Sequence, residues 1–112
     1  MNVRELQQKL SLTVFCGGRS MEYEVSGGYT CDLLSDVMGH ARSGNVWITL
    51  QTHQNVVAIA SLKELPAIVL VKGFNPDTGM MEHAEKEGIA ILGTDEDSFT
   101  VSGRIYQLLV SR

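Results

Sequence analysis

Five consecutive apolar residues, Ala67 to Val71, constrain the fold of this chain more than any other segment. A strand that is apolar on both faces is typical of the interior of a parallel sheet, because helices cover it on both sides. Pro66 ends the preceding helix, since proline lacks an amide donor and crowds the previous turn. The segment therefore predicts a central strand of an α/β sheet.

Strands and helices alternate around this segment. β-Branched and aromatic residues predict strands at Val46–Leu50 and Ile89–Leu92. Helices are expected over Val56–Lys63, capped by Asn55, and over Met80–Glu87. This alternation predicts an α/β protein with a three-layer α/β/α fold and a mainly parallel central sheet.

The two ends of the chain add further elements. Apolar residues at helical spacing predict an N-terminal helix, followed by a strand over Leu12–Cys16. An extended segment is expected over Met21–Val25. Asp32 is expected to cap a short helix after it, and either Asp95 or Asp97 is expected to cap the last helix. The predicted apolar stripe of that last helix is Phe99, Ile105, Leu108 and Leu109, with Val101 near its edge.

Length and charge limit the class of protein. A chain of 112 residues has the length of one domain, so we expect residues 1–112 to form a single one. The net charge is −4 and the nine Lys and Arg residues are scattered, which argues against a nucleic-acid module. No apolar run approaches the length of about 20 residues that a membrane span needs. Cys16 and Cys31 are expected to be reduced thiols of a cytoplasmic protein.

The segment Gly17-Gly18-Arg19-Ser20 follows a predicted strand and has two interpretations. Glycines let backbone amides approach an anion, which Arg19 would clamp. However, the complete nucleotide-binding motifs are absent and no helix is expected after Ser20. A plain turn between strands is the simpler interpretation.

The second glycine pair, Gly27-Gly28, also leaves two possibilities open. Adjacent glycines adopt positive φ values at low steric cost, as in a sharp turn. They also occur where a ligand or another subunit comes close to the backbone. Both a turn and a binding contact are therefore consistent with this segment.

Polar residues follow the strand that ends near Thr49. In open α/β sheets, ligands bind at the carboxyl ends of the strands, so His53 and Asn55 are candidate ligand-binding residues. The alternative for Asn55 is that it only caps its helix. Elsewhere no paired spacing of Cys and His predicts a metal site, and no nucleophile motif is present. Cys16 fits a small buried side chain better than a reactive thiol.

The double-glycine segment resembles the DRTGG domain family. Members carry an Asp-Arg-Thr-Gly-Gly-like segment, and the matching residues here are Glu24-Val25-Ser26-Gly27-Gly28, with Val25 in place of the arginine. The resemblance covers roughly Leu12 to Leu109, and its longer matching stretches are Asp32–Gly39, Trp47–Thr49, His53 and Asn55–Ala60.

The resemblance implies a fold like that of the N-terminal domain of HPr kinase. Larger relatives place such a domain beside CBS domains in regulated pyrophosphatases, or beside acyl- and phosphotransferase domains. There it looks like a regulatory or dimerising module whose ligand is generally unassigned. If the arginine of relatives binds an anion, Arg19 or Arg42 would have to replace it here.

We therefore predict a non-enzymatic regulatory module, homodimeric, that binds a nucleotide or another small anionic metabolite and needs no cofactor or metal. The candidate ligand-binding residues are Arg19, Ser26, Gly27, Gly28, His53 and Asn55. One alternative is a small phosphotransfer or hydrolase component that uses His53 with Asp36. Another is a protein-interaction subunit of a redox or kinase-type complex.

Overall fold

The short apolar segments form one five-stranded sheet in the computed structural model, which describes residues 1–111. Helices separate most of the strands along the chain. In chain order the elements are α1 (Val3–Leu10), β1 (Thr13–Cys16), the 3₁₀ turn η1 (Arg19–Glu22), β2 (Gly27–Thr30), α2 (Leu34–His40), β3 (Asn45–Thr49), α3 (Gln54–Lys63), β4 (Ala67–Leu70), α4 (Thr78–Glu87), β5 (Ala90–Gly93) and α5 (Ser98–Val110).

The strands follow the order β1-β5-β4-β3-β2. β2 to β5 are parallel, and β1 pairs with β5 in the antiparallel direction. In this register Ile68 of β4 lies between Trp47 of β3 and Ile91 of β5. The strand that the sequence places in the sheet interior therefore does lie there, with all four of its residues buried.

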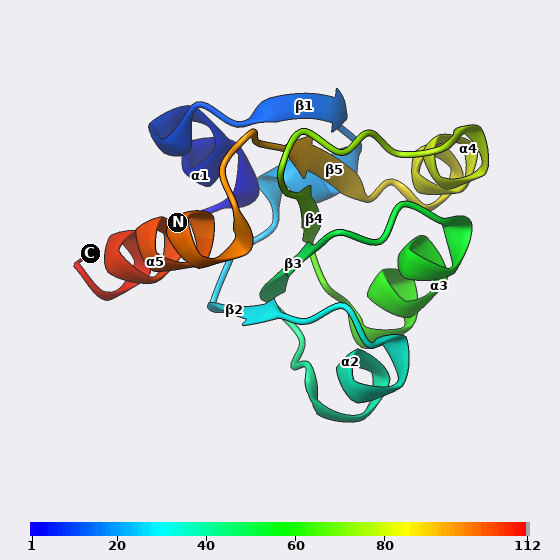
Figure 1. Cartoon of the computed structure of the whole chain (residues 1–112), viewed down its shortest axis with the longest axis horizontal. Coiled ribbons are helices and arrows are strands. Elements are labelled where there is room, and N and C mark those ends of the chain that lie inside the picture. Colours follow the sequence, from blue (N-terminus) through cyan, green and yellow to red (C-terminus); the bar gives the residue numbers. More distant parts are fainter. Residues whose placement is uncertain (112) are drawn as a thin grey trace.

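Helices cover both faces of the sheet. α1 and α5 lie on one side, and α2, α3 and α4 lie on the other (Figure 1). This arrangement confirms the predicted three-layer α/β/α fold with a mainly parallel sheet. No helix within residues 1–111 is long and apolar enough to cross a membrane.

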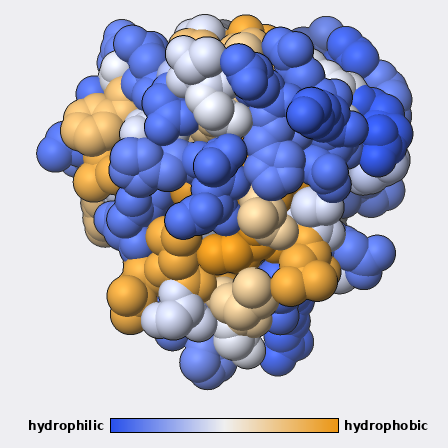
Figure 2. Space-filling model, turned by 90° about the vertical axis from the view of Figure 1, so that its right-hand side faces the viewer, coloured by the Kyte–Doolittle hydropathy of each residue, from blue (hydrophilic) through white to orange (hydrophobic). Residues whose placement is uncertain are grey.

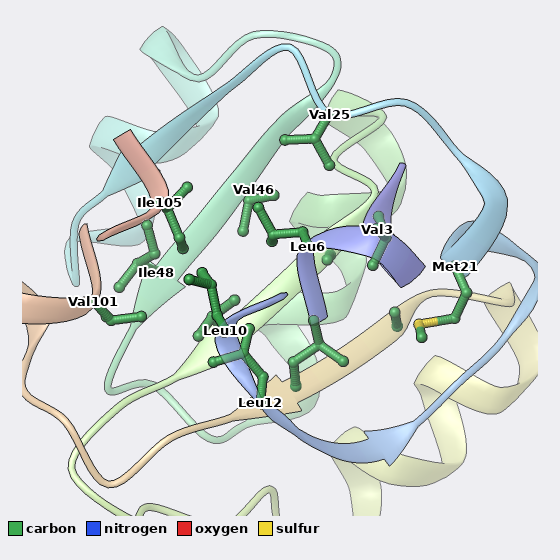
Figure 3. Packing of buried hydrophobic residues seen from close by; sticks show 14 of the residues in the cluster. Val3, Leu6, Leu10, Leu12, Met21, Val25, Val46, Ile48, Val101 and Ile105 are labelled. Carbon is green, nitrogen blue, oxygen red and sulfur yellow. The ribbon is translucent and has the colours of Figure 1, made fainter. Parts of the chain in front are cut away.

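Side chains of the strands alternate between two cores, because successive residues of a strand point to opposite faces. Val46 and Ile48 of β3 pack with Leu6 of α1 and Ile105 of α5 (Figure 3). Trp47, between them in the chain, packs with the α2, α3 and α4 layer. Burying a side chain such as that of Leu6 contributes roughly 1.5–3 kcal/mol to the free energy of unfolding. Because both faces of the sheet bury such side chains, both helix layers stabilise it.

Of the two interpretations left open for Gly27-Gly28, the turn is wrong, because both residues belong to strand β2. Their φ values are not in the positive range that a glycine turn uses. No α-helix begins directly after Ser20, as expected; a single 3₁₀ turn, η1, spans Arg19–Glu22 instead. Gly18 precedes η1 with φ +56°, so the first glycine pair is the one that makes a turn.

Two predicted helix caps are wrong, and the cap expected at Asp95 or Asp97 is confirmed. α2 begins at Leu34, and Asp32 instead accepts hydrogen bonds from β3. α3 begins at Gln54 with His53 at its N-cap, so Asn55 lies inside the first turn. Asp97 caps α5 through the Thr100 amide, and Gly88 ends α4 with φ +71°.

Candidate ligand-binding site

A groove runs between the edge strand β2 and helix α5. It has a volume of about 480 Å³, and we call it the β2–α5 groove. Its walls combine apolar side chains with hydroxyl groups. The lining residues are Ser26, Gly27, Gly28, Thr30, Ile48, Ser102, Ile105, Tyr106, Leu109 and Val110.

Gly28 explains why the sheet is hollow at this place. It pairs with Val46, whose side chain packs on the α1 and α5 side, so Gly28 faces that side too. A Cβ at Gly28 would lie 3.6 Å from the Val46 carbonyl oxygen and 3.7 Å from Cδ1 of Ile48, which is ordinary contact. The glycine is therefore not forced by crowding, and its missing side chain leaves the groove open.

Hydrogen bonds fix the two ends of this strand. At its end, Oγ1 of Thr30 and Oγ of Ser102 are 2.7 Å apart and hydrogen-bonded, which ties β2 to α5. Before its start, the Ser26 amide donates to the Gly44 carbonyl at 3.0 Å. The Ser26 side chain lies directly over Gly44, which has φ +88°. The groove is thus held in shape by contacts on both sides.

Arg19 lies in a second hollow, at the amino end of the sheet. This Arg19 hollow has a volume of about 280 Å³, and Ser43 and Gly44 line it, so the Ser26–Gly44 contact lies between it and the β2–α5 groove. Within residues 1–111 the Arg19 guanidinium makes no hydrogen bond or ion pair. Its side chain rests on Gly88, where a Cβ would collide with it.

The chain around Arg19 is firmly held. The amide of the buried Ser20 donates to the Gly88 carbonyl at 3.0 Å, and Oγ of Ser20 accepts from the Ala90 amide at 2.7 Å. Glu24, Glu64 and Glu87 also line the hollow. Three carboxylates around one guanidinium disfavour a highly charged anion.

His53 and Asn55 lie elsewhere, at the carboxyl end of β3. Nδ1 of His53 is 3.1 Å from Oδ2 of Asp77, and both side chains are largely exposed. The Met80 amide, and to a lesser degree His53, hold the pKa of the Asp77 carboxyl below its ordinary value. Neither His53 nor Asn55 lines the β2–α5 groove or the Arg19 hollow.

Asp36, the partner suggested for His53, belongs to a different cluster. Its Oδ2 accepts from the Tyr29 hydroxyl at 2.5 Å and from the Cys31 thiol at 3.4 Å. Within residues 1–111 no contact joins Asp36 to His53. Nor does the described part of the chain hold a cluster of side chains suited to a metal ion. The catalytic alternative therefore lacks the pair that it would need.

Cys16 has the environment expected of a structural thiol. It is buried beside α4, and burial, together with the negative charge of Glu85, raises the pKa of its thiol. A thiol with a raised pKa is a poor nucleophile at neutral pH.

The six predicted ligand-binding residues thus fall in three places. The groove gathers Ser26, Gly27 and Gly28, the neighbouring hollow holds Arg19, and His53 and Asn55 lie at the opposite end of the sheet. The sequence does not identify the other wall of the groove, formed by Ser102, Tyr106 and Leu109. Their spacing on α5 predicts one helix side, but only the topology brings that side against β2.

Comparisons with known proteins agree with this fold. The family model described as "DRTGG domain" matches residues 5–108. The regulatory region of Clostridium perfringens pyrophosphatase, a structure of CBS and DRTGG domains complexed with the activator diadenosine tetraphosphate, aligns with a TM-score of 0.73 at 17% identity. The alignment covers 95% of this chain and 46% of that one, so this chain spans less than half of that region. No curated protein matches the sequence.

Proposed function

This chain belongs to the DRTGG domain family, and on that premise we propose that it is a regulatory module that binds a small ligand and catalyses no reaction itself. The first class of ligand to consider is a nucleotide. The structurally similar regulatory region is complexed with a nucleotide activator, diadenosine tetraphosphate. The groove beside the double glycine is the observation that carries the proposal to this chain.

The chemistry of the β2–α5 groove suits the uncharged part of such a ligand. Tyr106, Leu109 and Val110 offer apolar surface to a flat ring, while hydroxyl groups such as that of Ser102 offer hydrogen bonds to a sugar. Among the described residues, 1–111, no charged side chain lines the groove. We therefore place the base and ribose of a nucleotide here, with the phosphate outside.

Arg19 is a candidate for binding the anionic group, because its hollow lies across the Ser26–Gly44 contact from the groove. Val25 cannot take this role, because its side chain is buried in the core, where the family segment has arginine. The glutamates around Arg19 favour a single phosphate over a polyphosphate chain. The proposal is thus a module for a nucleoside monophosphate or a similar small anionic metabolite.

Isothermal titration calorimetry with AMP tests this assignment. Gly28→Leu puts a side chain into the groove and is expected to weaken AMP binding at least tenfold. The matched control is Gly103→Leu, because Gly103 is exposed on α5 with no atom within 4 Å of a Cβ there. Equal binding by Gly28→Leu and the wild type would overturn the groove as the site, and binding unchanged in Arg19→Gln would overturn the role of Arg19.

We also propose that the chain forms a homodimer through helices α2 and α3. The exposed residues Leu33, Met38 and Leu62, with exposed fractions of 64%, 38% and 69%, define the α2–α3 apolar surface. Figure 2 shows apolar side chains gathered in the lower half of this side of the molecule, where these helices lie.

The composition of α3 supports a covered surface. Its outward positions Ala58 and Leu62 are apolar, and Lys63 is the charged residue of the helix. Exposed apolar positions on one helix face are typical of a surface that another protein covers. A second copy of the chain presents the same surface, as a twofold interface requires.

Light scattering coupled to gel filtration tests the dimer. Leu62→Glu is expected to give a monomer, whereas Val110→Glu, at a similarly exposed position on α5, is expected to leave the dimer intact. A wild-type monomer at tens of micromolar would overturn the dimer and favour a different partner protein on this surface.

A further inference from the structure

The connections that follow β4 and β5 leave the sheet on opposite sides. These strands are parallel neighbours, yet the chain after β4 leads to α4 on one face and the chain after β5 leads to α5 on the other. In Figure 1 the yellow-green segment runs to the right and the orange segment to the left. In open α/β sheets a crevice forms outside the strand ends at such a switch point, and ligands bind there.

A hollow of about 430 Å³ occupies this position, and we call it the switch-point hollow. Gly73, Phe74 and Asn75 line it from the first connection, and residues 93–96 line it from the second. The two connections are joined by backbone hydrogen bonds, from Lys72 to Glu96 at 2.8 Å and from Gly73 to Thr94 at 2.9 Å. The walls are thus fixed without a ligand.

The charges of the hollow exclude an anion. Asp95 is exposed, and within residues 1–111 its side chain makes no hydrogen bond or ion pair. Arg104 is the positively charged residue among those that line the hollow, and its Nη1 forms an ion pair with Oε1 of Glu96 at 2.7 Å. Among the described lining residues no unpaired positive charge is left, so a phosphate group has no partner.

Two aromatic rings complete the walls. The Phe15 ring lies against Gly93, where a Cβ would collide with it, so this glycine lets the ring reach the strand end. Phe74 is 46% exposed on the other connection. Aromatic faces bind flat rings by stacking, and a carboxylate accepts hydrogen bonds from N–H groups.

We propose that the switch-point hollow is a second ligand site, which binds an uncharged or cationic aromatic heterocycle with N–H donors, of the kind found in nucleobases and nucleosides. Phe74 stacks on the ring and Asp95 accepts from its amino group. The site is independent of the groove proposed for the nucleotide, because the two lie on different strands and share no lining residue.

Two-dimensional NMR of the full chain, titrated with adenosine and cytidine, tests this site. The amide signals of residues 73–75 and 94–96 are expected to shift with at least one of the two nucleosides. Phe74→Ala and Asp95→Asn are each expected to weaken binding at least fivefold. The matched control Phe99→Ala removes a ring that is 89% exposed and lines no part of the hollow, and it is expected to bind as the wild type does.

The Gly28→Leu variant separates this site from the groove, since it blocks the groove and leaves the hollow unchanged. Shifts at residues 73–75 that persist in Gly28→Leu support the second site. Shifts confined to β2 and α5, or binding that is unaffected by both Phe74→Ala and Asp95→Asn, overturn it. Tighter binding of AMP than of adenosine at residues 94–96 also overturns it, because no unpaired cation among the described residues lines the hollow.

Discussion

The Asp32 carboxylate joins the segment after β2 to the end of β3. Its Oδ1 accepts from Oγ1 of Thr49 and from the Leu50 amide, each at 2.8 Å. Thr49 is fully buried, so its hydroxyl depends on this acceptor. A sequence pattern cannot distinguish this role from a helix cap, because both place an acidic residue before a helix and only the fold brings Thr49 within reach.

Asp32→Ala is expected to destabilise the protein by about 1–3 kcal/mol, the cost of leaving a buried donor without a partner. Asp32→Asn keeps an acceptor oxygen and is expected to recover most of this loss. Urea unfolding followed by circular dichroism measures both values. A loss that is equal in the two variants would mean that the negative charge, and not the hydrogen bond, stabilises this junction.

Gly18 is the second residue whose identity the fold requires. It has φ +56° and ψ 173°, a region that only glycine adopts readily. A Cβ there would lie 2.6 Å from the carbonyl carbon and oxygen of Gly88, and backbone atoms cannot move aside as a flexible side chain does.

Gly18→Ala is therefore expected to cost at least about 1–3 kcal/mol. Gly39→Ala is the matched control, because Gly39 lies inside α2 with no atom within 4 Å of a Cβ. In a helix interior this change is expected to stabilise by roughly 0.5–1 kcal/mol. Thermal unfolding of the two variants compares them directly, and a harmless Gly18→Ala would contradict the close packing of Gly18 on Gly88.

At the level of helices and strands, the sequence predicts the elements well. It predicts less well which other elements each one packs against. The last helix shows the reason. Phe99 was expected in its apolar stripe but is 89% exposed, whereas Val101, expected near the edge, is fully buried. Hydrophobicity marks a residue as suitable for the core. The side that a helix buries is decided by its neighbours, here β2 and β3, and no local pattern encodes them.

Strand β2 and helix α2 are linked by the hydrogen bond from Tyr29 to Asp36. This bond, with smaller effects of burial and of the Asp36 charge, raises the pKa of Tyr29 to about 12. An unfolded tyrosine titrates near pH 10. The bond therefore contributes stability fully below about pH 10, and this contribution is lost as the pH rises from about 10 to about 12. At acid pH the same hydrogen bond lowers the pKa of the Asp36 carboxyl. The stability that the Asp36 carboxylate contributes is therefore lost only as the pH falls below the ordinary pKa of an aspartate.

An alkaline titration that follows the absorbance of ionised tyrosine is expected to show a late phase near pH 12 in the native protein. Tyr29→Phe is expected to remove this phase. Tyr106→Phe is the control, because Tyr106 is 70% exposed on α5, on the opposite face of the sheet from this bond. A late phase that survives in Tyr29→Phe would assign the slow ionisation to another tyrosine.

On the scale of the whole molecule, three hollows lie around one sheet: the β2–α5 groove, the Arg19 hollow and the switch-point hollow. The alternation of strands and helices predicts the sheet and its layers, and the double glycine predicts one wall of the groove. The crossing of the last connection to the opposite face was not predictable from the pattern, because a helix can follow a strand on either side. That crossing places α5 over β2, which makes the groove, and opens the switch-point hollow beside β5.

The two cores share the sheet, so they are expected to unfold together. Ala67 and Val69 of β4 belong to the α1 and α5 side, whereas Ile68 and Leu70 belong to the other. Leu6→Ala removes a fully buried side chain from the first core and is expected to cost about 2–5 kcal/mol. Trp47, buried in the second core, reports on the opposite face through its fluorescence.

If the molecule unfolds in one cooperative step, Leu6→Ala shifts the fluorescence transition of Trp47 and the circular dichroism transition to the same lower denaturant concentration. Gln8→Ala, on the exposed side of α1, is the control and is expected to change stability by less than about 0.5 kcal/mol. A Trp47 transition that stays in place while the helical signal moves would show that the two layers unfold separately. In that case a ligand in the β2–α5 groove would stabilise only the α1 and α5 layer, and it could not act on the α2–α3 apolar surface through the sheet.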